Sequence, residues 1–155
     1  ALLFGTMRTL SAATRLKLHD GLPRLAQGIA AAHGASATVE IIPGFPVTNC
    51  DGRAVALGET VTKRLFGEDA WLTLANPIMG AEDFAFFVDQ KHGIPGYYFA
   101  VGGTKPEWIA AAKNGGPSVA GHHSPLFKID PESSVRLGIE ATTAAVLDLL
   151  GPSKN

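Results

Sequence analysis

Several features that define common classes of protein are scarce in this sequence of 155 residues. A single cysteine excludes an intramolecular disulfide framework. Thirteen basic residues against 14 acidic ones give a formal net charge of −1, which argues against an electrostatic surface for nucleic acid. The apolar runs fall far short of the roughly 20 residues that a membrane-spanning helix needs. We therefore expect neither nucleic acid nor a membrane among its partners.

Familiar catalytic motifs are also missing. The sequence has no Gly-x-Ser-x-Gly elbow, and its glycine pairs match neither a dinucleotide-binding nor a phosphate-binding loop. No basic leader precedes the first apolar stretch, so we expect no signal peptide and take the cytoplasm as the default location. The chain has no initiator methionine and opens on a strand pattern, which suggests a fragment or a processed product.

What the sequence does contain is an alternation of strand and helix patterns. Short apolar segments typical of strands occupy residues 2–9, 37–42, 70–74 and 97–101. Apolar residues at helical spacing occupy residues 12–33, 53–66, 81–91 and 131–149. Residues 102–121 have the composition of a long loop, and the Pro/Gly-rich residues 43–46 form the best candidate boundary. Strands that alternate with helices predict an α/β fold.

Two short segments carry side chains suited to chemistry. His123 lies in a loop ahead of the last predicted helix, where an imidazole can be a metal ligand, a general base or an ordinary surface residue. Glu82 and Asp83 lie at the start of a predicted helix, whose dipole alone explains two carboxylates. The same position, at a strand-to-helix turn, is also where ligand-binding groups project in α/β proteins.

Five segments, taken in order, carry a resemblance to a known family. They are Gly5–Thr9, Ala26–Gly34, Pro43–Asn49, Met79–Ala85 and His123–Phe127. The series resembles the C-terminal part of the metal-dependent amidohydrolases that cleave N-acyl amino acids. That family includes hippurate hydrolases, auxin-conjugate hydrolases and related aminoacylases and carboxypeptidases. The Gly-x-Glu-Asp-Phe and His-x-Pro-x-Phe segments are its most specific signals.

The resemblance implies a two-domain enzyme, in which a catalytic α/β domain binds two metal ions and a ferredoxin-like lid is inserted into it. Residues 1–42 would be the last β-α-β of the lid, and residues 43–155 the C-terminal half of the catalytic sheet domain. The partners implied are a small N-acyl amino acid with an aromatic or aliphatic acyl group, the missing N-terminal half of the enzyme, and a second copy paired through the lid.

The resemblance also implies roles for individual residues. His123 would be a ligand of one ion of a pair of zinc, manganese, cobalt or nickel ions. The substrate pocket would be lined by Glu82, Asp83, Gly80, Asn49 and Arg8. The family's remaining ligands and its catalytic glutamate lie upstream of this chain, so we expect the fragment alone to bind no metal pair and to be inactive.

Two alternatives stay open at this point. The chain could be a non-catalytic fragment or paralogue that acts as a binding or assembly module, since the lid remnant favours dimer contacts. It could also be an unrelated small α/β binding domain, if the ordered motifs arose by chance.

Overall fold

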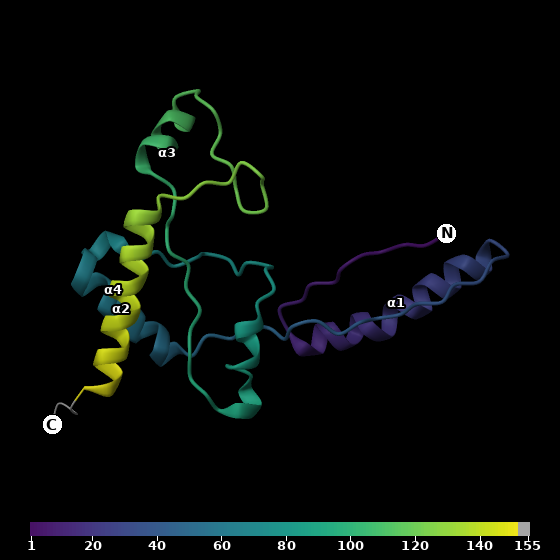
Figure 1. Cartoon of the computed structure of the whole chain (residues 1–155). Helices are drawn as coiled ribbons and strands as arrows, with labels where there is room; N and C mark the ends of the chain where they lie inside the picture. Colours follow the sequence, from purple (N-terminus) through teal and green to yellow (C-terminus); the bar gives the residue numbers. More distant parts are fainter. Residues whose placement is uncertain (152–155) are drawn as a thin grey trace. The chain divides into compact units, whose positions relative to one another are not determined.

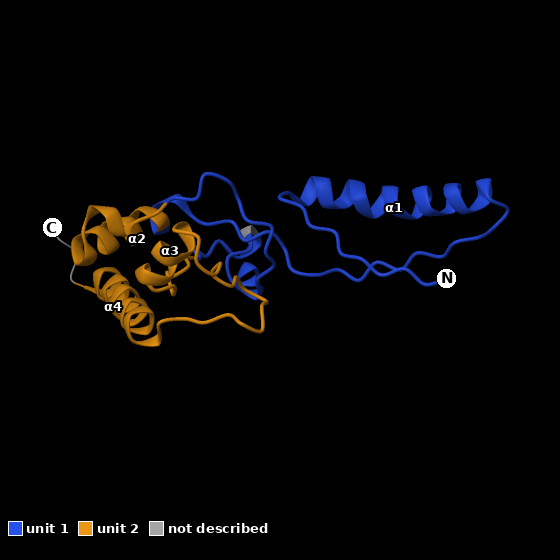
Figure 2. Ribbon diagram, turned by 90° about the horizontal axis from the view of Figure 1, so that it is seen from above, with its two compact units in different colours: residues 1–54, 73–98 blue, residues 55–72, 99–155 orange. Residues whose placement is uncertain are grey.

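The computed structural model describes residues 1–151, apart from the side chain of Gln90, and divides into two compact units (Figures 1 and 2). Unit 1 comprises residues 1–54 and 73–98, and unit 2 comprises residues 55–72 and the described residues from 99 onward. No helix in the described part of the chain is long and apolar enough to cross a membrane. The division into a lid of residues 1–42 and a catalytic half of residues 43–155 stays a prediction.

Unit 1 is dominated by α1 (Ala12–Ala32), which begins at a capped turn. The Ser11 Oγ accepts a hydrogen bond from the Thr14 N–H at 3.1 Å, which satisfies one of the free donors of the first turn. Pro23 lies inside the helix, which nevertheless runs on to Ala32. Gly34 follows the C-cap with a left-handed φ of 67°, a conformation that glycine adopts at little cost at a helix end.

The rest of unit 1 contains two 3-10 turns, η2 (Asp83–Phe86) and η3 (Gln90–His92), where the sequence predicts one helix over residues 81–91. The Asp89 carboxylate accepts a hydrogen bond from the Lys91 N–H at 3.1 Å. Such a local bond competes with the helical pattern, which explains the interruption. Ala85 and Val88, on either side of the end of η2, are the buried apolar residues of this unit.

Unit 2 is built on a pair of helices, α2 (Gly52–Phe66), most of which belongs to this unit, and α4 (Pro131–Leu150) (Figure 1). An ion pair joins the two helices, with the Arg64 Nη1 2.9 Å from the Asp148 Oδ2. Val61 of α2 and Ala141 of α4 are buried. The short helices η1 (Glu68–Ala70) and α3 (Pro106–Lys113) complete the unit.

The predicted α/β fold is wrong, because residues 1–151 form helices and irregular segments and contain no strand. The predicted β-α-β remnant of the lid and the half sheet of the catalytic domain therefore do not form. Residues 2–9 and 37–42 run as irregular chain alongside α1 (Figures 1 and 2). Apolar composition shows that a segment suits a pleated surface, whereas a strand needs the hydrogen-bond ladder of a neighbouring strand.

Gly96 allows residues 96–98 to approach the end of η2 closely. A Cβ at this position would lie 2.8 Å from the Val88 Cγ1 and 3.4 Å from the Phe84 Cζ. We predict that Gly96→Ala lowers the free energy of unfolding by about 1–3 kcal/mol, because the added methyl overpacks this contact. Urea denaturation measures the change.

The matched control is Gly44→Ala, because a Cβ at Gly44 would meet no atom within 4 Å. We expect that control to change stability by less than about 0.5 kcal/mol. Equal effects of the two substitutions would show that the close approach at Gly96 does not exist in solution.

Candidate functional site

Three segments of unit 1 meet around Tyr98. The Asp51 N–H donates a hydrogen bond to the Gly96 carbonyl at 2.8 Å, and the Tyr98 N–H donates to the Cys50 Sγ at 3.4 Å. The Tyr98 hydroxyl donates to the carboxylate of Glu82. Two regions that the sequence singles out, residues 49–51 and the start of η2, are thereby attached to the same short segment.

The electrostatics of this contact show in the pKa of Tyr98. The hydrogen bond to Glu82 raises this pKa above its ordinary value, since the carboxylate favours the protonated hydroxyl. Desolvation and the negative charges of Glu82 and Asp83 act in the same direction. Glu82 is half-buried and Asp83 is exposed, so Tyr98 holds the less exposed of the two carboxylates.

Aromatic rings of unit 1 form two groups near this contact, Phe84 with Phe87 and Tyr98, and Phe45 with Phe86; we call these five residues the aromatic cluster. Its ring centroids lie 5.7 Å apart for Phe84 and Tyr98, 5.7 Å for Phe45 and Phe86, and 6.3 Å for Phe84 and Phe87. Phe86 and Phe87 are 48% and 66% exposed. The cluster therefore offers accessible aromatic surface, and one of its members, Tyr98, contacts Glu82.

The remaining pocket residues predicted from the sequence are less closely tied to this cluster. Asn49, Gly80 and Arg8 are all exposed. Asn49 is connected through its neighbour Cys50. Within residues 1–151, no hydrogen bond or ion pair joins Gly80 or Arg8 to the other predicted pocket residues. Their assignment to a substrate pocket stays a prediction.

His123 lies in unit 2, at a turn in which its own backbone is left-handed. Its φ of 67° is the one positive value at a non-glycine position in the described residues. The Ser124 N–H donates to the Gly121 carbonyl at 3.3 Å and closes the turn. The side chain is exposed and has no hydrogen bond or ion pair within the described part of the chain. Its imidazole is therefore available to a ligand.

A metal centre needs more donors than the single imidazole of His123. Zinc sites use three or four protein ligands, and no group of three or more His, Cys, Asp or Glu side chains within residues 1–151 is arranged to hold an ion. By the chemistry of its donor, His123 fits one ligand position of a metal site. The other ligands are not supplied by a cluster around it in the described residues.

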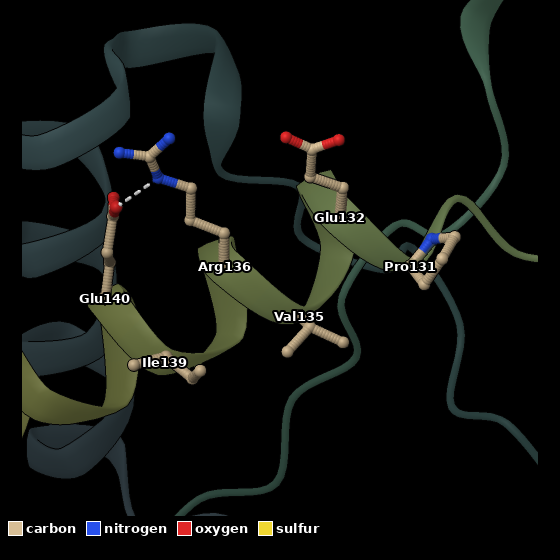
Figure 3. A pocket seen from close by; sticks show the side chains of 6 residues that line it. All are labelled: Pro131, Glu132, Val135, Arg136, Ile139 and Glu140. Atoms are coloured by element: carbon tan, nitrogen blue, oxygen red, sulfur yellow. Dashed lines mark hydrogen bonds and ion pairs between the residues drawn. The ribbon is translucent and has the colours of Figure 1, made fainter.

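Two open hollows on the surface contain none of the predicted site residues. One, of about 310 Å³, follows the exposed face of α4 and is lined by Val135, Ile139 and the ion pair of Arg136 Nε with Glu140 Oε1 at 2.8 Å (Figure 3). The other, of about 780 Å³, follows the apolar face of α1 in unit 1. The first brings Glu132, Arg136 and Glu140 together along one face of α4, and the second is lined by α1 together with Met7. Neither holds a residue of the candidate site.

The sequence did not reveal the contacts that Tyr98 and His122 make. Tyr98 falls in a segment with the pattern of a buried strand, so nothing in the sequence indicated that its hydroxyl bonds Glu82. The ring of His122 packs on that of Phe127, with centroids 4.8 Å apart. Two rings five residues apart in a loop follow no period that would have revealed this contact.

From the hydrogen bond between Tyr98 and Glu82 we predict how two substitutions change the pKa of Tyr98. Glu82→Gln lowers the pKa of Tyr98 towards its ordinary value, because the charged acceptor is lost. Asp83→Asn, the matched control, causes a smaller fall, since Asp83 acts on Tyr98 through charge alone. Alkaline titration of tyrosinate absorbance, in a Tyr97→Phe background that leaves one tyrosine, measures both. A larger effect of Asp83→Asn would contradict the geometry.

Comparison with known proteins gives relatives, although no protein-family model matches the chain. It is 30% identical over 128 residues to the uncharacterized hydrolase y4tI of Sinorhizobium fredii. It is 30% identical over 131 residues to the N-acetylcysteine deacetylase of Bacillus subtilis. It is 28% identical over 132 residues to the IAA-amino acid hydrolase ILR1-like 2 of Arabidopsis thaliana. Each alignment covers 83% of this chain.

The same alignments cover 28%, 29% and 27% of these three proteins, so the chain spans between a quarter and a third of the relatives' length. The three are named as hydrolases or as a deacetylase, and two of the names specify an acylated or conjugated amino acid. The family resemblance drawn from the ordered motifs is confirmed. The chain belongs to the amidohydrolase family that includes N-acetylcysteine deacetylase and the IAA-amino acid hydrolases.

Proposed function

We propose that this chain is part of a metal-dependent enzyme that hydrolyses the amide bond of N-acyl amino acids. The observation that carries the proposal is the alignment of 83% of the chain with both the N-acetylcysteine deacetylase and the IAA-amino acid hydrolase. Both names describe the cleavage of an amino acid from its conjugate. A shared requirement for that chemistry explains why one stretch of sequence is similar in a bacterial and a plant protein.

In the proposed enzyme, His123 would hold one of a pair of divalent ions, which would supply Lewis-acid chemistry for the amide carbonyl and a water molecule. The contribution of this chain is His123, whose free imidazole would bind one ion through a ring nitrogen. The chain spans between a quarter and a third of its relatives' length. The general base and the other ligands would come from the remaining part of the enzyme. The chain by itself is then inactive.

The charges of unit 1 suggest how a substrate would lie. An N-acyl amino acid carries a free carboxylate, which the negative charges of Glu82 and Asp83 repel. The aromatic cluster beside Glu82 suits an aromatic or aliphatic acyl group instead. Arg8 is exposed and has no ion pair within residues 1–151, so its guanidinium is suited to the free carboxylate of the substrate.

The surface of α1 favours a second candidate function, that of an assembly module. The apolar side chains of Leu18, Leu22, Leu25 and Ile29 are 40%, 39%, 60% and 55% exposed along one face. All four line the 780 Å³ hollow in unit 1. Exposed apolar surface of this extent marks an interaction site, and we propose that a second copy of the chain, or the rest of the enzyme, covers it.

A chimera tests the proposed catalytic role of His123. In it, this chain replaces the aligned 131-residue segment of the B. subtilis N-acetylcysteine deacetylase. We predict that the chimera hydrolyses N-acetyl amino acids and that His123→Ala reduces kcat/KM at least about 100-fold, because loss of even an outer partner of a metal ligand costs 10–100-fold.

The matched control is His33→Ala, which removes another exposed histidine and is expected to leave the rate unchanged. Hydrolysis that survives His123→Ala, or hydrolysis by the chain without the rest of the deacetylase, would refute the assigned role.

The assembly role predicts that the chain self-associates through α1. Replacing Leu25 and Ile29 by Ser removes two side chains that are each worth about 1.5–3 kcal/mol when buried. The double variant should therefore weaken association by about 100-fold or more, as measured by sedimentation equilibrium. Leu150→Ser, in the 80%-exposed last residue of α4, is the control and should change little. If the chain without substitutions is monomeric, a second copy is not the partner that covers this face of α1.

A further inference from the structure

The backbone of His123 is held in a conformation that favours glycine. The turn from Gly121 to Ser124 places His122 and His123 at its two central positions, and only the second has a positive φ. A positive φ at the third residue of a turn is the mark of a type II turn, where glycine or asparagine is preferred. A histidine in that position persists only because surrounding contacts hold it there.

The structure identifies those contacts on both sides of His123. On its C-terminal side, the Phe127 N–H donates to the Ser124 carbonyl at 3.0 Å and the Leu126 N–H donates to the Ser124 Oγ at 3.1 Å. These two bonds fold residues 124–127 back on the turn. On its N-terminal side, the ring of His122 packs on the ring of Phe127 with the planes inclined at 36°.

The ring contact bridges the turn. The backbone hydrogen bond from Phe127 to Ser124 fixes Phe127. The ring contact between His122 and Phe127 therefore connects the residues on the two sides of His123. Rotation of His123 to an ordinary negative φ would change the direction of the chain between the two rings and separate them. The two adjacent histidines are thus in different situations, one packed on an aromatic ring and one free.

We propose that His122 is a positioning residue for His123. Its contact with Phe127 keeps residue 123 in the left-handed conformation and so presents the His123 imidazole in a fixed direction. This inference rests on the proposed function, since it gives a purpose to the turn only if His123 is a metal ligand. Fixing a ligand in advance spares the ordering cost that a freely rotating loop would pay on binding the ion.

The first test is spectroscopic and needs no metal. A left-handed residue has a short distance between its own amide and α protons, so His123 should give a strong intraresidue nuclear Overhauser effect. We expect His122→Ala in the full chain to weaken that signal several-fold, and His122→Phe, which keeps a ring against Phe127, to retain it. An unchanged signal in His122→Ala, or equal loss in both variants, overturns the proposal.

A second measurement covers the case in which His122→Ala disturbs the whole chain. His123→Gly relieves the left-handed backbone and should raise Tm relative to His123→Ala, which removes the same imidazole but keeps the Cβ. A Tm for His123→Gly at or below that of His123→Ala overturns the claim that the turn is held against its preference.

The closing experiment separates this proposal from the proposed function. In the deacetylase chimera, we expect His122→Ala to weaken zinc retention against a chelator by about 10–100-fold, as loss of groups that orient a metal ligand does. His122→Phe should restore it. If His123→Ala loses zinc but His122→Ala does not, the positioning role fails and the ligand stands. If neither variant loses zinc, the ligand assignment and the proposal built on it both fail.

Discussion

Burial of apolar surface is the constraint on which the rest of this structure depends. Among the described residues, the almost fully buried apolar side chains are Ala85 and Val88 in unit 1 and Val61 and Ala141 in unit 2. Larger side chains, such as Leu25 and Ile29 of α1, remain more than half exposed. A fully buried leucine or isoleucine contributes about 1.5–3 kcal/mol, so much of the free energy that this sequence could gain by burial is still available for contact with other surfaces.

With so small a core, polar and aromatic contacts fix the regions that carry the candidate site residues. In unit 1, the bonds of Tyr98 to Cys50 and Glu82 gather segments that are almost 50 residues apart in the chain. In unit 2, a few backbone bonds and the rings of His122 and Phe127 hold the turn at His123. Such local contacts orient a side chain without a large core beneath it. A single presented imidazole becomes a metal site only when further ligands are supplied to it.

Helical spacing predicted three of the four expected helices correctly, and it failed over residues 81–91, where two 3-10 turns form. The helical spacing over residues 12–33, 53–66 and 131–149 gave α1, α2 and α4 to within about two residues, because an α-helix satisfies its own backbone. The Lys105-Pro106-Glu107 start of α3 was overlooked within a predicted loop, although proline in the first turn is a helix signal. The strands could not be predicted in this way, since apolar segments such as 2–9 become strands only beside a partner.

The candidate site was predictable to a similar extent. The ordered motifs led to the family and selected Glu82 and His123, and the relatives confirm the family. They could not reveal the hydrogen bond of Tyr98 or the ring contact of His122, because both contacts depend on how irregular segments fold back. Side chains in such segments follow no period, so their partners emerge only from three-dimensional structure.

The central claim is that this chain carries one ligand of a metal site whose remaining ligands lie elsewhere in the enzyme. Elemental analysis of the purified chain, with hydrolysis of N-acyl amino acids assayed on the same sample, tests it most directly. The account predicts far less than one metal ion per chain and no turnover. About two ions per chain together with turnover would contradict it, because one imidazole cannot hold two catalytic ions.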